Sequence, residues 1–383
     1  MRGKATLQKS VIKRCSAIHL LFLLYNCFVN KHGCLKDPNL EYLAPETDVQ
    51  ASSRKEDHID LAFASSTPPS EIDPRFYYEP MLSGHNTCAA HQQSITIGGK
   101  KMQQPIWVSS MTGGTEKAIT INRNLAKLCG VYGLGMGLGS CRQLLYEDKR
   151  LVEFDIRALM PKSPLFINLG IAQVETLLAN KETELIDALI AKLDADGLII
   201  HVNPLQEWLQ PEGDIIKVPP IETVQALVES ATYPIIVKEV GQGFGKESLR
   251  QLLALPLEAI DLAGYGGTNF SKLELLRSDP IKHDNLKPVC QLGHTCEEMI
   301  TIINDLKGST QPLKSPKIII SGGIKNFLDG YYHMSRCQLP SIYAQASGFL
   351  KYAMDYEALN TYCHTQIEGL KMAKSFLRLK SMT

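Results

Sequence analysis

The chain has 383 residues, of which 44% are hydrophobic and 21% are charged, a composition typical of one large globular domain or two ordinary ones. Forty basic residues balance forty acidic ones, which excludes a protein that binds nucleic acid or a membrane surface through bulk charge. The ten cysteines contain no CxxC pair, so they indicate reduced thiols of a cytoplasmic protein rather than a zinc finger.

Residues 1–50 begin with basic residues and continue into the apolar run "SAIHLLFLLYNCFV". A poor signal or anchor sequence is one interpretation, and an extension that is irrelevant to the fold is the other. The run contains His19 and Asn26, lacks a clear cleavage site and is short for a bilayer, which favours the second interpretation. We leave this extension unassigned, and we expect no stable membrane association because no other segment could span a bilayer.

From Pro105 onward, short apolar runs alternate with amphipathic helical patterns. Eight such units in about 250 residues predict an α/β protein with a closed (β/α)8 TIM barrel, and an open doubly wound sheet is the competing architecture. We expect helical structure in "QLLYEDKRLVEFDIRALM" and in "QVETLLANKETELIDALIAKL", and a helix closed by Gly130 in "EKAITINRNLAKLCG". The expected strands are "PIWVSSM", "GLGMGLG", "SPLFINLG", "DGLIIHV", "YPIIVKEV", "EAIDLAG", "PKIIISGG" and "PSIYAQA".

Glycines beside Ser or Thr follow the last three expected strands. Backbone N–H groups approach an anion closely where Cβ is missing, and barrel enzymes often bind phosphate after their last strands. A phosphate site is therefore predicted at Gly267, Thr268, Ser321, Gly322, Gly323, Ala346 and Ser347.

Lys238 ends an otherwise apolar strand, where an unpaired buried charge would be costly. Its ammonium group either reaches the barrel rim or faces the electron-rich edge of a bound cofactor. With the phosphate site and polar groups at Thr112 and Asn168, the second interpretation indicates flavin mononucleotide (FMN). A dinucleotide is disfavoured because "GLGMGLG" does not open a helix.

These residues belong to a series of motifs that resembles the type 2 isopentenyl-diphosphate isomerases, which are FMN-dependent barrel enzymes. The resemblance extends from about Arg54 to Leu350. The α-hydroxy-acid oxidases share the glycine-rich loops but not the string that begins at His201. The motifs stand in the order "RKEDHI", "MTGG", "GLGS-R", "NLG", "HVNPLQEWLQPEGD", "VKEVGQG", "GYGGTN" and "SGGIK".

The resemblance implies conversion of isopentenyl diphosphate to dimethylallyl diphosphate in isoprenoid biosynthesis. Reduced FMN would act as proton donor and acceptor, Mg²⁺ would bind the diphosphate, and NADPH would be the external reductant. It also implies a homo-oligomer, either a tetramer or an octamer. The residues agree, because no pair of carboxylates obvious in the sequence would protonate an unactivated alkene.

The same resemblance assigns roles to individual residues. Gln206, His201 and Asn203 would be catalytic, with Gln206 nearest the reacting carbons, although His201 by itself could be a satisfied strand-end histidine. Glu207 would bind Mg²⁺, which is typically held by one or two carboxylates together with substrate phosphates. The substrate would contact Arg54, Lys55, His58, Ser140, Arg142 and Gln206, and FMN would contact Met111, Thr112, Gly113, Gly114, Ser140, Asn168 and Lys238 besides the phosphate site.

Three positions depart from the family pattern. Cys141 stands where a Gln is usual, Tyr332 stands where a Lys is common, and "AQAS" is a less glycine-rich end to the eighth strand. Two other functions stay open, an FMN-dependent hydroxy-acid oxidase or dehydrogenase and a flavin-binding barrel without catalysis. We predict a substrate-binding arm over residues 51–104 and an FMN-binding barrel over residues 105–383.

Overall fold

The computed structural model describes residues 51–85, 95–110, 116–308, 313–315 and 317–380. The chain divides into two compact units, residues 1–72 and 73–383. The first unit contains helix α2 (Ala51–Leu61) and the 3-10 helix η1 (Pro69–Glu71). Within the described ranges, no helix is long and apolar enough to cross a membrane. The apolar run of residues 16–29 lies outside the described residues, and the boundary at residue 104 stays a prediction.

Eight parallel strands close into a barrel in chain order, which confirms the predicted (β/α)8 fold. Closure is direct, because the eighth strand pairs with the first over Tyr343–Gln345 and Ile106–Val108. All eight expected segments form these strands. They are β4 (Ile106–Val108), β5 (Gly135–Gly137), β6 (Leu165–Gly170), β7 (Gly197–Val202), β8 (Ile235–Glu239), β9 (Ala259–Asp261), β10 (Ile318–Ile320) and β11 (Ser341–Gln345).

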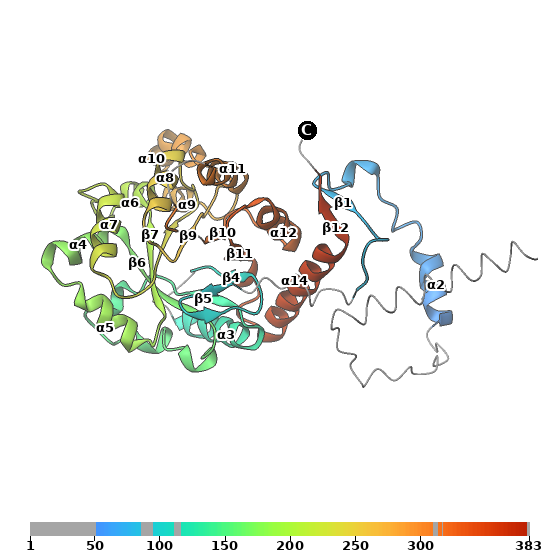
Figure 1. Cartoon of the computed structure of the whole chain (residues 1–383), viewed down its shortest axis with the longest axis horizontal. Coiled ribbons are helices and arrows are strands. Elements are labelled where there is room, and N and C mark those ends of the chain that lie inside the picture. Colours follow the sequence, from blue (N-terminus) through green and yellow to red (C-terminus); the bar gives the residue numbers. More distant parts are fainter. Residues whose placement is uncertain (1–50, 86–94, 111–115, 309–312, 316, 381–383) are drawn as a thin grey trace, which may run out of the picture. The chain divides into compact units, whose positions relative to one another are not determined.

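Helices surround the strands in the second unit (Figure 1). The long C-terminal helix ends in a short strand that pairs antiparallel with Phe76–Tyr78, so both ends of this unit meet in one small sheet. The helices are α3 (Glu116–Tyr132), α4 (Ile171–Asn180), α5 (Glu184–Lys192), α6 (Pro204–Leu209), α7 (Pro220–Ser230), α8 (Lys246–Ala254), α9 (Phe270–Arg277), α10 (Pro280–Leu286), α11 (Cys296–Lys307), α12 (Phe327–Arg336), α13 (Ser347–Leu350) and α14 (Tyr356–Phe376), and the small sheets are β1 (Phe76–Tyr78) with β12 (Leu377–Leu379) and β2 (Thr96–Ile97) with β3 (Lys100–Lys101).

The prediction of helical structure in "QLLYEDKRLVEFDIRALM" is wrong, because the segment forms no α-helix. The segment forms three 3-10 helices instead, η3 (Arg142–Leu144), η4 (Leu151–Glu153) and η5 (Arg157–Leu159). Buried Phe154 and Ile156 pack against the main core between these turns, and the buried Arg157 guanidinium donates to three backbone carbonyls. Such tertiary contacts outweigh the local preference for a helix.

Two other expected helices differ at their ends. The segment 173–193 breaks at Lys181, which has φ +60° and caps α4 before α5 begins. Helix α3 runs through Gly130, where an added Cβ would lie 2.2 Å from the Leu159 carbonyl oxygen. Gly130 therefore permits close packing of α3 against η5 instead of ending the helix, and Gly133, with φ +66°, follows the last turn.

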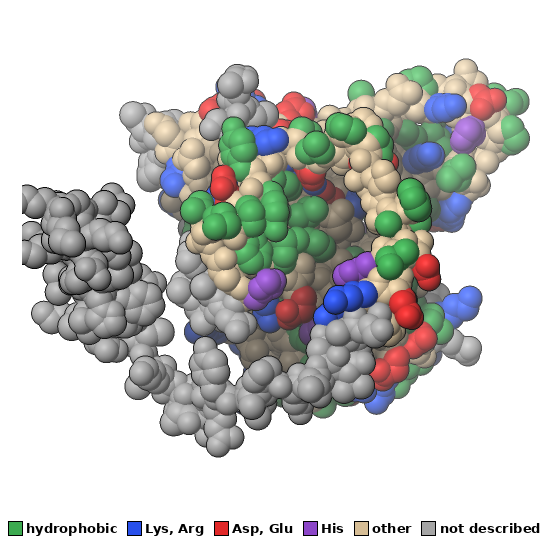
Figure 2. All heavy atoms as spheres, turned by 90° about the vertical axis from the view of Figure 1, so that its right-hand side faces the viewer, with side chains coloured by type: hydrophobic (Ala, Val, Ile, Leu, Met, Phe, Trp, Pro, Cys, Tyr) green, Lys and Arg blue, Asp and Glu red, His purple; other side chains and the backbone are tan. Residues whose placement is uncertain are grey.

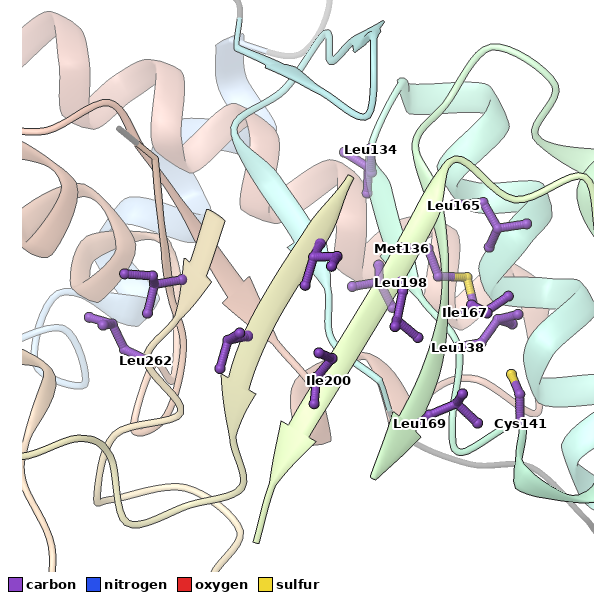
Figure 3. Packing of buried hydrophobic residues seen from close by; sticks show 14 of the residues in the cluster. Leu134, Met136, Leu138, Cys141, Leu165, Ile167, Leu169, Leu198, Ile200 and Leu262 are labelled. Carbon is purple, nitrogen blue, oxygen red and sulfur yellow. The ribbon is translucent and has the colours of Figure 1, made fainter. Parts of the chain in front are cut away.

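Alternation along the strands separates two hydrophobic layers. Side chains that point outward pack under the helices, and Figure 3 shows part of this layer around Ile167, Leu169, Leu198 and Ile200. Side chains that point inward fill the barrel, together with Ile97 and Met102 of the β2–β3 hairpin region. We call this inner cluster the plug, and its strand members are Trp107, Phe166, Ile199, Ile236, Ala259, Ile319, Ile342 and Ala344.

Arg157 ties together the loops that lead into β6 and β7. It is only 7% exposed, and besides its three bonds to carbonyls it pairs with Asp196 at 2.8 Å. Asp196 also accepts from the backbone N–H of Leu165, the first residue of β6. The ion pair therefore fixes where these two strands start, and both strands carry predicted site residues.

We expect Arg157→Met to lower the free energy of unfolding by about 3 kcal/mol, because three backbone carbonyls lose their donor and Asp196 keeps only the less buried Lys100 as an ion-pair partner. Chemical denaturation measures this change. Arg250→Met is the control, since Arg250 forms an exposed pair with Glu247, and it should cost at most about 0.5 kcal/mol. Equal effects of the two substitutions would contradict the structural role of Arg157.

Candidate active site

Six side chains form a layer at the carboxyl end of the strands, directly above the plug. Successive residues of a strand point to opposite faces, so residues two positions after a plug residue also point inward. Register supports this placement, because His201 pairs with Lys238 and Lys238 pairs with Asp261 across β7, β8 and β9. We call the six the mouth layer, which consists of Ser109, Asn168, His201, Lys238, Asp261 and Ser321.

His201 is held by Asn168 from the neighbouring strand, with 2.7 Å between its Nδ1 atom and Oδ1 of the amide. The Asn168 amide N–H donates to the Leu138 carbonyl, so its oxygen faces the ring and Nδ1 carries the proton. Burial, and secondly the charge of Lys238, lowers the pKa of His201 to about 4. The ring is therefore neutral at pH 7, and its Nε2 atom is a hydrogen-bond acceptor. Gly170 lies close to this atom, since a Cβ added to Gly170 would be 2.9 Å from Nε2.

Lys238 and Asp261 place opposite charges beside each other in this layer. Lys238 donates from Nζ to the Glu239 carbonyl at 2.6 Å, and Asp261 accepts from the Ser321 hydroxyl. Burial raises the pKa of Asp261, while Lys238 and the bond from Ser321 act in the opposite direction. Asp261 was not predicted from the sequence, although an acidic residue in the apolar segment "EAIDLAG", two positions after a plug residue, was a usable signal.

The polar side chains that follow β7 form a hydrogen-bond network. Asn203 donates from its amide to Gln206 Oε1 at 3.1 Å and to Glu207 Oε1 at 2.8 Å. The other oxygen of Glu207 accepts from the backbone N–H of Asp214 at 2.7 Å. Asp214 in turn accepts from Arg142 and from Gln173, each at 2.7 Å. Together these bonds fix the three side chains that the resemblance assigns to substrate and metal.

Gln206 has a second partner that the sequence did not indicate. Its amide N–H donates to Glu274 of α9 at 3.3 Å. Glu274 is 3% exposed and forms an ion pair with Arg277, which also pairs with Glu212. Both ends of the Gln206 amide are thus held. Glu274 lies 68 positions away in sequence, so no local pattern connects the two residues.

The glycine-rich turns after β9 and β10 interlock, as a phosphate site requires. Gly322 has φ +90°, and an added Cβ would lie 2.0 Å from the Gly264 carbonyl oxygen. An added Cβ on Gly267 would lie 3.1 Å from the Gly323 nitrogen. At Gly322 this approach requires glycine, and glycine-rich turns of this kind are able to present backbone N–H groups to an anion. Of the other predicted contacts, Thr268 is exposed in the turn after β9, Ser347 is exposed at the start of α13, and Ala346 just before it is half-buried.

The remaining predicted residues lie outside the mouth layer. Ser140 and Arg142 follow β5 and are exposed, and Arg142 and Asp214 border a cleft of about 790 Å³. Cys141, between them, is fully buried, and burial raises the pKa of its thiol to about 12. Arg54, Lys55 and His58 are exposed on α2 of the first unit. Met111, Thr112, Gly113 and Gly114 lie outside the described residues.

The polar groups of the mouth layer fit a flavin. Ser109 Oγ and Asp261 Oδ2 of this layer, and Asn203 Oδ1 of the segment after β7, are among the buried side-chain atoms of the described residues that have no hydrogen-bond partner, so each is available to a ligand. The described ranges contain no cluster of three or more His, Cys, Asp or Glu that could hold a metal. Glu207 is thus not part of a preformed cluster of this kind, whereas Mg²⁺ is typically held by one or two carboxylates together with water and substrate oxygens.

The chain is similar to curated bacterial isomerases over most of its length. It is 34% identical over 330 residues to the isopentenyl-diphosphate delta-isomerase of Rickettsia peacockii (strain Rustic), which covers 85% of this chain and 90% of that protein. The enzyme of the same name from Legionella pneumophila (strain Corby) is 34% identical over 286 residues, or 73% and 80% of the two chains. No protein-family model matches the chain.

Solved structures share the fold at much lower identity. A flavocytochrome b2 variant with bound sulfite has a TM-score of 0.53 and 14% identity, over 82% of this chain and 77% of its own. A mandelate oxidase variant has a TM-score of 0.51 and 13% identity, over 80% and 86%. At this identity the likeness extends to the barrel fold alone.

The low pKa of His201 has a consequence for stability. Unfolded histidine binds a proton near pH 6.5, whereas folded His201 does so only near pH 4, so His201 should reduce the free energy of unfolding as pH falls through this window. The loss is up to about 3 kcal/mol. Urea denaturation between pH 7 and pH 4 should show a shallower slope for His201→Gln than for the unchanged protein. His364→Gln, on the exposed surface of α14, is the control and should keep the original slope, and identical slopes for all three would contradict the assignment.

Proposed function

The chain belongs to the isopentenyl-diphosphate delta-isomerases, and we propose on that premise that it converts isopentenyl diphosphate to dimethylallyl diphosphate by the flavin-dependent route of the type 2 enzymes. One observation carries the proposal. Asn203, which directly follows β7, holds Gln206 and Glu207 of α6 by hydrogen bonds, and β7 and β8 bring His201 and Lys238 into register at the barrel mouth. The same segment supplies the string that sets this family apart from the hydroxy-acid oxidases.

A flavin is the cofactor that this mouth supports. Lys238 supplies a cation inside the mouth, and the interlocked turns after β9 and β10 supply accessible backbone N–H groups for a phosphate. Ser109 and Asp261 contribute buried polar atoms that lack partners among the described residues. Flavocytochrome b2, a flavin protein by name, shares the barrel, although that likeness is of fold alone.

The reaction needs a proton at one carbon of the substrate and a proton acceptor at another. Reduced FMN, when bound, supplies this acid–base chemistry, and the residues of the chain orient the reactants around it. Gln206, held at both ends of its amide, lies against the hydrocarbon. Neutral His201 offers Nε2 as an acceptor to a substrate oxygen or to metal-bound water, and Asn203 holds Gln206 and Glu207 in place.

Glu207 is the proposed ligand of Mg²⁺, which neutralises the diphosphate. Its carboxylate accepts one hydrogen bond on each oxygen, so lone pairs remain for a cation. Arg142, Ser140 and the basic residues Arg54, Lys55 and His58 are the proposed protein contacts of the diphosphate. NADPH as reductant, a homo-oligomeric assembly and a cytoplasmic location belong to the same proposal by family resemblance.

The proposal is tested by supplying FMN, dithionite, Mg²⁺ and isopentenyl diphosphate and by following dimethylallyl diphosphate. We expect turnover that requires the reduced flavin and is lost with oxidised flavin. Oxidation of lactate or mandelate without isomerisation would favour a hydroxy-acid oxidase. Bound flavin without either reaction would favour a barrel that has lost catalysis, and a protein that binds no FMN would reject the flavin-dependent route.

We expect Glu207→Gln to raise the Mg²⁺ concentration for half-maximal activity by roughly 10–100-fold while FMN stays bound. The amide keeps the shape of the side chain but loses the charge that attracts a hard cation. Glu212→Gln is the matched control, because Glu212 is an exposed carboxylate just after α6 that pairs with Arg277. An unchanged Mg²⁺ dependence of Glu207→Gln would remove Glu207 from this role.

A further inference from the structure

A pocket of about 340 Å³ lies between the turn after β9 and the segment formed by α9, α10 and η6 (Lys287–Gln291). Its volume is within the range of small-molecule sites. Lys272, His283 and Lys287 line it, and no Asp or Glu is among its lining residues. We call it the basic pocket, and Gly267 is its one lining residue that the proposed reaction also uses.

The two lysines of the basic pocket are uncompensated. Within the described residues, neither Lys272 nor Lys287 takes part in an ion pair, whereas His283 contacts Asp284 at 3.0 Å. The positive charge of Lys272 acts on Cys290, another lining residue, whose pKa it lowers although burial raises that pKa overall. Two ammonium groups around a concave surface without a carboxylate attract an anion. Figure 2, by contrast, shows side chains of both charges interspersed over the face that it draws.

The walls of the basic pocket are fixed by hydrogen bonds. The Tyr265 hydroxyl and the Asn269 amide both donate to the Cys290 carbonyl, at 3.2 and 2.9 Å. Cys290 packs in a small hydrophobic cluster with Leu209 and Leu275. The pocket is therefore largely formed before a ligand binds. The Tyr265 side chain is 38% exposed, so its aromatic ring is available for stacking against the base of a nucleotide.

We propose that the basic pocket binds the phosphate group of a second ligand, distinct from the flavin and from the substrate diphosphate. Gly267 lines the basic pocket and also belongs to the predicted site for the flavin phosphate. Gly322 and Gly323, the partners of Gly267 at that site, do not line the pocket. The phosphate chemistry fits a nucleotide, whose base would meet Tyr265, and it also fits inorganic phosphate. The inference does not depend on the proposed isomerisation.

Isothermal titration of the FMN-saturated protein with ADP, with inorganic phosphate and with adenosine, all without Mg²⁺, tests the proposal. We expect Lys272→Met and Lys287→Met each to weaken binding by about 5–10-fold, because each removes one charge-assisted contact. Lys162→Met is the control, since Lys162 is exposed in the loop before β6, and it should change binding less than about twofold. All three lysines are exposed, so the variants should fold.

The outcomes separate the ligand sources from failure of the proposal. Lysine-dependent binding of ADP that is tighter than that of phosphate identifies a nucleotide, and equal binding of the two identifies a bare phosphate site. Binding of neither anion, or binding that is unaffected by both lysine substitutions, overturns the proposal. The same titrations are repeated with FMN-free protein. Binding that occurs only in that form also overturns the proposal, because the pocket would then belong to the flavin phosphate. Isomerase activity enters none of these readouts, so the proposed function can fail separately.

Discussion

Closure of the parallel barrel is the constraint on which the rest of the structure depends. Because β11 pairs with β4, every strand has one face toward the helices and one toward a shared interior. The plug fills the lower part of that interior with apolar side chains, so polar residues of the next inward position can lie only at the mouth. The same alternation that builds the core therefore also assembles His201, Lys238 and Asp261 from three different strands.

The electrostatics of the mouth follow from the close placement of these three side chains. Lys238 lies in register with His201 on one side and Asp261 on the other. Its positive charge helps keep His201 neutral and offsets part of the cost of burying Asp261. A neutral acceptor, a cation and a buried acid thus coexist within one layer. An anionic or electron-rich ligand over this layer would compensate Lys238, which is consistent with the proposed flavin.

The segment after β7 shows how a polar loop is made rigid. Asn203, Gln206 and Glu207 satisfy one another at helical spacing, and contacts from Asp214 and Glu274 hold them from outside α6. Networks of this kind are stable only when most members are satisfied. Within this network of described residues, Asn203 Oδ1 is buried without a partner, which leaves this acceptor available to a ligand. If a divalent cation binds here, it supplies positive charge for the substrate diphosphate, so fewer basic side chains are needed.

The sequence by itself determined the eight strands, the closed barrel and the identity of most residues at the mouth, because strand alternation and glycine-rich turns are local patterns. It also indicated the family through the string that begins at His201. Tertiary structure alone decided that the segment 143–160 is not a helix, that Gly130 is a packing position, and that Glu274 holds Gln206. Those features depend on partners distant in sequence, such as Asp196 for Arg157 and the Leu159 carbonyl for Gly130. Local sequence propensity cannot predict these contacts, because they form only when the folded barrel brings the distant segments together.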